Sequence, residues 1–308
     1  MATAIEVRDL TKRYGELVAV AGVSFRVERG ECFGILGPNG AGKTTTLEMI
    51  EGIRRPDAGT VEVLGASPWP RNPALLRRVG VQLQATAFIE HLSAIEQLRT
   101  VTDLYDVPHA RAGEVLDQVG LSACADQDVD DLSGGQRQRL SIACALVHSP
   151  EVLFLDEPSA GLDPGARRTL WDVLTSVRAQ GTTVVLTTHY MDEAEVLCDR
   201  VAVMEGGRIL AEDSPAELVR ELDAPTRLLL PPAALRLEVA REIDGVDDVE
   251  QVAGAMTLVT RRPADVLSRL TALEALDGLQ VRSGTLEDVF VALTGRTLAD
   301  PGTDAVPR

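Results

Sequence analysis

The segment that determines the architecture of this 308-residue chain reads Gly37-Pro38-Asn39-Gly40-Ala41-Gly42-Lys43-Thr44. It fits the phosphate-loop pattern G-x-x-x-x-G-K-[ST], in which backbone amides surround phosphate oxygens. A short apolar run, residues 32–36, precedes it, and residues 44–51 have the pattern of a helix. A strand, a glycine-rich loop and a helix in this order are the context in which the pattern binds phosphate. The alternative is an ordinary glycine-rich turn between a strand and a helix.

Three further motifs follow downstream in a fixed order. They are Leu132-Ser133-Gly134-Gly135-Gln136, then Val152-Leu153-Phe154-Leu155-Asp156-Glu157, then His189 after an apolar run. A chance match to the first pattern alone would not bring the other three with it. Together the four motifs predict that the chain binds ATP and hydrolyses it.

The phosphate loop divides its work among its residues. Gly37, Gly40 and Gly42 let the backbone approach phosphate oxygens, next to the positive end of the following helix. Lys43 is expected at the β- and γ-phosphates, where it contributes to catalysis, and Thr44 at Mg²⁺. The remaining residues assigned to nucleotide binding are Pro38, Asn39, Ala41 and Thr45.

Two acidic residues stand at the end of the second buried run. A carboxylate such as Asp156 is costly to bury unless it coordinates something, so we expect it to share Mg²⁺ with Thr44. Glu157 is then placed to act as the general base toward the attacking water. An acidic pair that merely caps a strand is the competing interpretation.

Ser133 precedes a predicted helix over residues 136–147, where it can serve as N-cap. A cap hydroxyl beside Gly134 and Gly135 at a positive helix end is also a second anion site. At this point the chain resembles the ATP-binding cassette (ABC) proteins, over about residues 4–220. In that family the segment 133–136 is the signature motif, which contacts the γ-phosphate of ATP held by another subunit. The resemblance therefore implies a homodimer in the ATP-bound state.

The resemblance also implies roles for residues that stand alone in the sequence. Tyr14 matches the aromatic residue that stacks on adenine, although an aromatic near a turn is as often part of a core. Gln84 matches a glutamine that reaches Mg²⁺, but Leu83 stands before it where a proline is frequent. Asp163 matches the subunit-interface loop, and His189 the histidine at the γ-phosphate, although a lone histidine after a strand is usually structural.

The predicted fold is α/β, a P-loop ATPase with a parallel sheet core and a small N-terminal antiparallel subdomain. A helical subdomain covers about residues 90–145 of an ATP-binding domain that spans 1–220. Residues 221–298 have the order β-α-β-β-α-β-α of a split βαβ sandwich and are predicted to form a small α+β accessory domain. Residues 299–308, rich in Asp, Pro and Gly, are expected to form a flexible tail.

Composition limits the partners. The net charge is −17, from 47 acidic and 30 basic residues, which disfavours nucleic acid and direct insertion into anionic lipid. No stretch approaches the roughly 18 apolar residues of a membrane-spanning helix, and the N-terminus has no signal-peptide pattern. Cys32, Cys124, Cys144 and Cys198 are scattered, as reduced thiols of a cytosolic protein are.

The C-terminal sequence narrows the resemblance. Residues 284–290 and 293–296, together with 48–52, are similar to drug-efflux ABC ATPases of the daunorubicin-resistance type. This implies an exporter ATPase at the cytoplasmic face of the cell membrane, where it drives efflux of a drug-like or hydrophobic compound through a separate transmembrane permease. The alternatives are a soluble ABC ATPase of translation or DNA repair, an importer ATPase, and a regulator that binds ATP without hydrolysing it.

Overall fold

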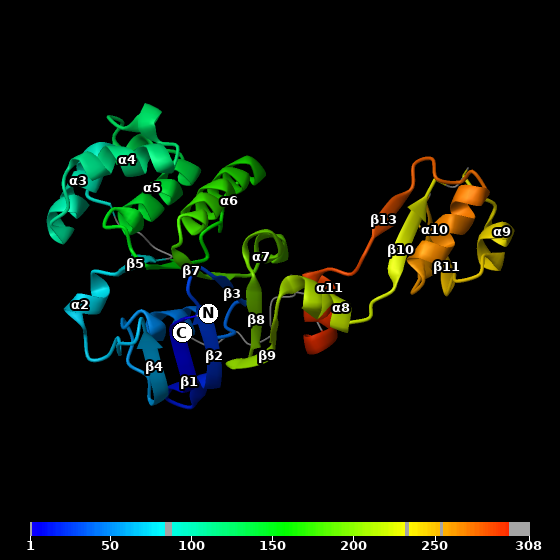
Figure 1. Ribbon diagram of the computed structural model, residues 1–308, viewed down its shortest axis with the longest axis horizontal. Coiled ribbons are helices and arrows are strands. Elements are labelled where there is room, and N and C mark those ends of the chain that lie inside the picture. The colour runs from blue at the N-terminus through cyan, green and yellow to red at the C-terminus, as the bar shows by residue number, and fades with distance from the viewer. Residues whose placement is uncertain (1, 84–87, 232–233, 253–254, 296–308) are drawn as a thin grey trace. The chain divides into compact units, whose positions relative to one another are not determined.

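The structure is a computed structural model that describes residues 2–83, 88–231, 234–252 and 255–295 (Figure 1). The chain divides into two compact units, residues 1–215 and 216–308, and each is described by itself. In the described part of the chain, no helix has the length and apolar character needed to cross a bilayer.

A six-stranded sheet with the order β5-β6-β7-β3-β8-β9 forms the centre of the first unit. Its strands are parallel except β9, which runs antiparallel to β8 at the edge. Every residue of β3, β6 and β7 is buried, as expected for parallel strands covered on both faces. The bounds are β3 (Cys32–Leu36), β5 (Val79–Gln82), β6 (Val152–Asp156), β7 (Thr183–Thr188), β8 (Arg200–Glu205) and β9 (Arg208–Asp213).

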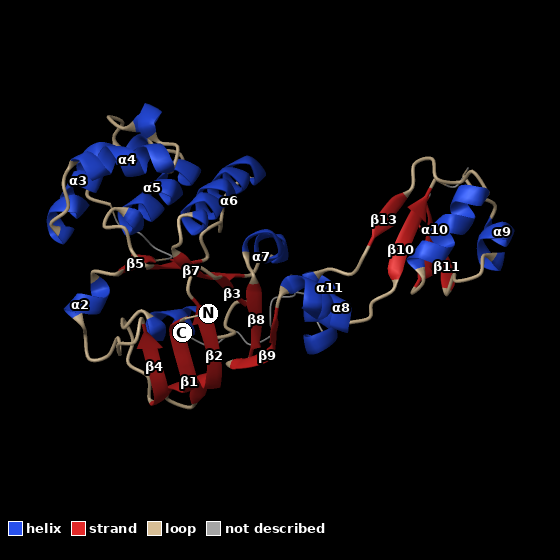
Figure 2. Cartoon of the chain, viewed as in Figure 1, coloured by secondary structure: helices blue, strands red, loops and turns tan. Residues whose placement is uncertain are grey.

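Helices and a second sheet cover this core. Figure 2 shows α5 (Gly134–Leu146), α6 (Pro164–Ala179) and α7 (Met191–Leu197) on one side of it. On the other side α1 (Lys43–Ile50) lies between the core and an antiparallel sheet with the order β2-β1-β4. The bounds of that sheet are β1 (Thr3–Tyr14), β2 (Leu17–Glu28) and β4 (Ala58–Val63).

The N-terminal antiparallel sheet confirms the alternation seen in the sequence. Val23, Phe25 and Val27 of β2 are buried, whereas Ser24 and Arg26 between them are exposed. The Phe25 ring stacks on Phe33 of the core sheet with the ring centroids 5.0 Å apart. These apolar faces meet in one continuous core on the α1 side of the molecule.

The predicted helical region contains α3 (Ala94–Tyr105), α4 (Ala110–Gln118) and nearly all of α5. Pro108 lies between α3 and α4, where a proline interrupts a helical pattern. The short helix α2 (Pro73–Leu76) comes just before β5 in the sequence.

The second unit contains an antiparallel sheet with the order β11-β12-β10-β13. Its strands and helices follow in the order β-α-β-β-α-β-α, which confirms the split βαβ arrangement. The bounds are α8 (Pro215–Glu221), β10 (Thr226–Leu230), α9 (Leu237–Glu242), β11 (Asp248–Val252), β12 (Ala255–Thr260), α10 (Pro263–Ala272), β13 (Gln280–Arg282) and α11 (Leu286–Thr294). The predicted tail 299–308 lies outside the described residues.

Candidate active site

The glycine-rich loop between β3 and α1 comes so close to its neighbours that side chains would not fit. A Cβ added at Gly37 would lie 2.1 Å from the Met204 carbonyl oxygen. Gly42 has a φ of 100°, and its added Cβ would lie 2.3 Å from the Ala19 carbonyl oxygen. Gly42 is also the N-cap of α1, so the left-handed glycine turns the chain into the helix.

Lys43 places a buried ammonium group inside this loop, with only 4% of its side chain exposed. Its Nζ donates to the carbonyl oxygens of Gly37 at 2.8 Å and Pro38 at 3.2 Å. Glu157 Oε1 lies 3.2 Å from the same nitrogen. Burial lowers the pKa of Lys43, and the Glu157 carboxylate opposes that shift. The loop therefore holds a cation where a phosphate would meet it.

Asp156, at the carboxyl end of β6, accepts hydrogen bonds from two threonine hydroxyl groups. Thr44 Oγ1 donates to Asp156 Oδ1 at 3.1 Å, and Thr187 Oγ1 donates to the same oxygen. Burial raises the pKa of Asp156, while these two hydrogen bonds oppose the shift. The sequence had not singled out Thr187; its only signal is a hydroxyl in an apolar strand two residues before His189.

Glu157 lies between Lys43 and His189. Its Oε1 is the oxygen near Lys43, and its Oε2 lies 3.3 Å from His189 Nδ1. The residue has a left-handed φ of 48°, and its N–H donates to the carbonyl and hydroxyl oxygens of Thr187 at 3.1 and 3.0 Å. A strained backbone that neighbours hold in place is common at active sites.

A cavity of about 450 Å³ opens beside these groups. Tyr14 lines it together with Lys43, Thr44 and Glu157, and the remaining lining residues are Leu17, Ala19, Asn39, Gly40, Ala41, Gly42 and Thr45. The Tyr14 side chain is 41% exposed, and the Arg54 guanidinium carbon lies 5.3 Å from its ring centroid. The cavity therefore brings an aromatic ring and the phosphate loop to one place.

The signature segment builds the start of α5. Ser133 is the N-cap, which confirms that interpretation, and accepts from the Gln136 N–H at 3.3 Å. Gln136 Oε1 accepts from the Ser133 N–H at 2.8 Å, and Gln136 Nε2 donates to Cys124 Sγ at 3.1 Å. Neither Ser133 nor Gln136, nor Gly134 or Gly135, is among the residues that line the Tyr14 cavity.

Asp163 begins α6 in a similar way. It accepts from the N–H groups of Gly165 and Ala166 at 2.9 and 3.0 Å, so within one chain it is an N-cap. Gln84, the remaining metal ligand predicted from the sequence, lies outside the described residues.

A buried carboxyl that the sequence did not indicate connects several of these motifs. Glu193 of α7 is fully buried, and Trp171 Nε1 donates to its Oε1 at 3.3 Å. Burial raises the pKa of Glu193, and the neighbouring hydroxyls of Thr188 and Ser159 oppose the shift. Glu193 thus lies between the loop that contains Ser159 and the strand end that carries His189.

Comparison with known proteins places these features in a family. The model of the ABC transporter family matches residues 20–160. The chain is similar to the Nod factor export ATP-binding protein I of Ralstonia nicotianae, with 40% identity over 96% of this chain and 95% of the relative. It is also 41% identical to the protein of that name from Paraburkholderia xenovorans, over 96% and 99% of the two chains.

Solved structures agree. An ATP-binding cassette of an ABC transporter in its ADP conformation shares 26% identity, with a TM-score of 0.65 over 70% of this chain and 93% of that one. A dimeric structure of a bacterial ABC transporter cassette shares 27% identity, with a TM-score of 0.63 over 68% and 98%. The chain therefore belongs to the ABC transporter family, as an ATP-binding subunit that hydrolyses ATP.

Proposed function

We propose that this chain is the Mg²⁺-dependent ATPase subunit of an exporter, and that it acts at the cytoplasmic face of the membrane on a separate permease. The observation that carries the catalytic part is the position of Glu157 between Lys43 and His189, at a cavity that Tyr14 also lines. In this proposal, adenine stacks on Tyr14 and the phosphate loop binds the β- and γ-phosphates. Glu157 lies next to the γ-phosphate, where hydrolysis takes place.

The oxygen atoms at the end of β6 fit a magnesium ion. Thr44 Oγ1 and Asp156 Oδ1 lie 3.1 Å apart, and hydroxyl and carboxylate oxygens are ligands that Mg²⁺ accepts. These two residues would hold the ion, and Gln84 is proposed as a third ligand. When bound, Mg²⁺ neutralises charge that develops on the phosphates.

The protein groups then divide the hydrolysis among them. When ATP binds, the Lys43 ammonium group leaves the loop carbonyl oxygens and contacts the β- and γ-phosphate oxygens. The negative charge of the phosphates offsets the free-energy cost of burying the ammonium group. Glu157 accepts a proton from the attacking water as the water oxygen bonds to the γ-phosphorus, while the bond from the γ-phosphorus to the β–γ bridging oxygen breaks and ADP leaves. His189, 3.3 Å from Glu157, orients the carboxylate and contacts the γ-phosphate.

The nucleotide site is completed by a second copy of the chain. Ser133 and the glycine amides behind it form a helix N-terminus, which attracts anions, yet they do not line the Tyr14 cavity of their own chain. We therefore propose that they contact the γ-phosphate bound by the partner copy, with Asp163 at the same interface. The dimeric form of a related cassette supports this arrangement.

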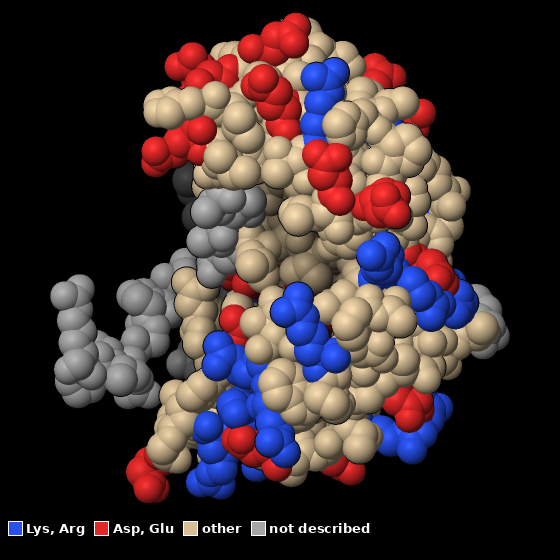
Figure 3. Space-filling model, turned by 90° about the vertical axis from the view of Figure 1, so that its left-hand side faces the viewer, with Lys and Arg blue, Asp and Glu red and all other residues tan. Residues whose placement is uncertain are grey.

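The permease is proposed to dock in a groove of about 700 Å³ between α2, β5, α3 and α5. Leu83 and Leu104 line it and are 45% and 75% exposed, an apolar surface of the kind that partners cover. Figure 3 shows this side of the first unit, with mostly acidic side chains above a largely uncharged hollow and basic side chains mixed with acidic ones below it.

The direction of transport is inferred from the relatives, whose name is Nod factor export ATP-binding protein. The similarity of residues 284–296 to daunorubicin-resistance ATPases extends the proposal to efflux of a hydrophobic, drug-like compound, with resistance as its consequence. The substrate would contact the permease instead of this chain.

The docking proposal is tested by co-purification of the membrane protein from cells that express the tagged chain. Leu104→Asp is expected to reduce recovery of that protein at least tenfold while ATP affinity stays unchanged. Val196→Asp, on the exposed surface of α7 outside the groove, is the matched control and should not change recovery. Equal recovery with Leu104→Asp would exclude the groove, and recovery of ribosomal material instead would exclude transport.

A further inference from the structure

One face of the sheet of the second unit lies outside the apolar cluster that packs against its helices. The charged side chains at the edges of this face are exposed, whereas Thr257 and Val259 at its centre are only 8% and 9% exposed. Leu228 and Leu230 of β10 and Met256 and Leu258 of β12 belong to the cluster packed against α9 and α10. Because side chains alternate along a strand, Leu229, Thr257 and their neighbours point to the opposite face. No residue of that opposite face belongs to the cluster, within the part of the unit that the structure describes.

Charges are segregated across this opposite face. One cross-strand row reads Asp248, Val259, Arg227, Arg282 from β11 to β13. The next row reads Glu250, Thr257, Leu229, Gln280 in the same direction. The β11 edge is therefore acidic and the β10–β13 edge is basic, with small or apolar side chains between them.

The charged residues of this face differ from those around it in their ion pairs. Elsewhere in the unit Arg262 pairs with Asp244 and Arg261 with Asp223. By contrast Arg227, Arg282, Asp248 and Glu250 have no ion-pair partner among the residues that the structure describes. Arg227 and Arg282 even stand directly opposite each other on adjacent strands, which is unfavourable for like charges.

We propose that this face pairs with the same face of a second copy of the chain. A two-fold axis parallel to the strands places the acidic β11 edge of each copy over the basic β13 edge of the other. The arrangement is self-complementary, as a two-fold interface requires: Asp248 of each copy faces Arg282 of the other, with Glu250 and Arg227 beside this pair. Because four strands span only about 15 Å, the contact is small and adds to a larger interface instead of replacing it.

The inference rests on the proposed function, since the larger interface is the ATP-bound dimer. Two reversal variants test it in a Glu157→Gln background, which should accumulate that dimer. Arg227→Glu with Arg282→Glu makes both edges acidic, and Asp248→Arg with Glu250→Arg makes both basic. Sedimentation velocity with Mg-ATP then gives the dimer dissociation constant of each variant and of their mixture.

Each variant alone is expected to raise the dissociation constant about tenfold, and the equimolar mixture to restore it by forming heterodimers. Arg241→Glu with Arg269→Glu carries the same charge change on the helices and should leave the constant unchanged. Added salt should weaken the parent dimer and abolish the advantage of the mixture.

Two results separate this inference from the proposed function. If the parent dimerises with ATP but the reversal variants and their mixture do so equally well, the sheet pairing is wrong and the ATP-bound dimer stands. If the parent does not dimerise with Mg-ATP, the dimer part of the proposed function fails. Cross-association of the two variants without nucleotide, at high protein concentration, then still decides for or against the sheet.

Discussion

Glu51, the C-cap of α1, is a carboxyl group buried without compensation. The residue is only 4% exposed, and its Oε1 has no hydrogen-bond partner among the described residues. Burial, and then the negative charge of Asp156, raise the pKa of Glu51 to about 8. The native protein therefore keeps this proton between the ordinary pKa of 4.5 and about 8, whereas the unfolded chain releases it.

This linkage fixes the sign of a pH effect. Since the native state binds more protons across that window, Glu51 lowers the free energy of unfolding as pH rises from 4.5 to about 8. Glu51→Gln should raise that free energy by about 1–3 kcal/mol at pH 8 and change it little at pH 4.5. Urea unfolding at the two pH values measures it, with Glu62→Gln as an exposed control. A loss of stability at pH 8 would contradict this reading of Glu51.

How far the sequence predicts single residues depends on whether they belong to a local motif. The structure gathers Lys43, Thr44, Asp156 and Glu157, because the loop and the strand end each fix their own residues. Thr187 and Glu193 could not be found in the same way. Their roles arise only when β6, β7 and α7 pack together, and nothing in the sequence gives that contact.

At the scale of elements, α3 and α5 begin with the same structure and allow a clean comparison. Ser93 and Glu96 form a capping box at α3, and Ser133 and Gln136 form one at α5. Loss of an N-cap serine costs about 1 kcal/mol in stability. If Ser133 also contacts ATP in the partner copy, variants of the two serines should lose similar stability and differ only in ATPase activity.

We expect Ser133→Ala and Ser93→Ala to lower the free energy of unfolding by similar amounts, about 0.5–2 kcal/mol. Only Ser133→Ala should reduce kcat for ATP hydrolysis, by tenfold or more, because it removes a ligand of the γ-phosphate. Denaturant unfolding and steady-state hydrolysis on both variants check this. Equal loss of activity in the two would reduce Ser133 to a helix cap.

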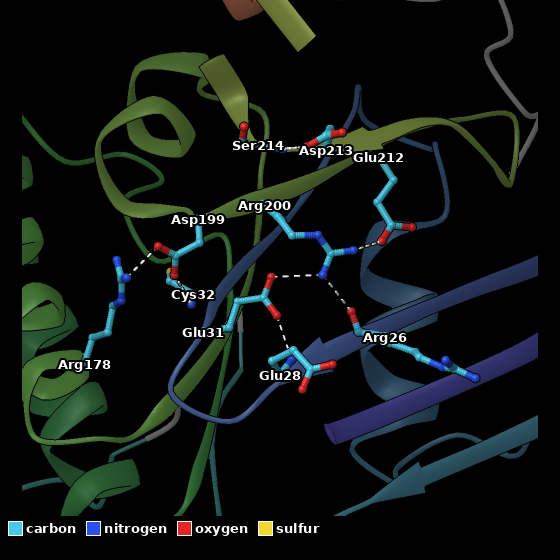
Figure 4. A network of polar contacts seen from close by, with 10 residues as sticks. All are labelled: Arg26, Glu28, Glu31, Cys32, Arg178, Asp199, Arg200, Glu212, Asp213 and Ser214. Atoms are coloured by element: carbon cyan, nitrogen blue, oxygen red, sulfur yellow. Dashed lines mark hydrogen bonds and ion pairs between the residues drawn. The ribbon is translucent and has the colours of Figure 1, made fainter. Parts of the chain in front are cut away.

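The edge of the core sheet depends on long-range ion pairs that no local pattern indicates. Arg200 of β8 contacts Glu31, Glu212 of β9 and the carbonyl oxygen of Arg26 (Figure 4). Its guanidinium lies 3.0 Å from the Glu31 carboxylate and donates to the Arg26 carbonyl oxygen at 3.2 Å. Glu31 in turn accepts from the Glu28 N–H at 2.6 Å. The network joins β2 and the turn that follows it to β8 and β9, since Arg200 lies 169 residues beyond Glu31 in the sequence.

Arg200→Met should destabilise the protein, because it leaves Glu31, only 8% exposed, without its cation. Arg200 is itself a third exposed, so solvent screens the pair and we expect a loss of about 1–2 kcal/mol. Arg8→Met removes a pair in which Arg8 is 63% exposed and should change little. Thermal unfolding of the two variants measures the difference; equal effects would show that the network adds nothing.

For the whole molecule, the order of strands and helices was sufficient to predict a parallel core and a separate C-terminal sheet. Buried apolar runs that alternate with helices, and half-buried strands near the N-terminus, have different patterns, so the layers could be told apart. The strand order, the antiparallel edge strand β9 and the helix α8 could not be predicted, because they depend on tertiary packing. The domain boundary near residue 220 stays a prediction.

The assembled molecule is proposed to work as two copies that close around ATP and reopen after hydrolysis. The closed pair can drive a permease only if ATP binds it more tightly than the open form. Hydrolysis is the step that lets the closed pair reopen, and Glu157 is the group assigned to activate the water for that step.

The most direct test compares Glu157→Gln with the unchanged chain, bound to its permease and supplied with Mg-ATP. The amide keeps the shape of the side chain but cannot accept the proton, so ATP should bind with a dissociation constant within about threefold of the parent, while kcat falls at least a hundredfold. Hydrolysis by Glu157→Gln within a few-fold of the parent would contradict the assigned base and with it the mechanism.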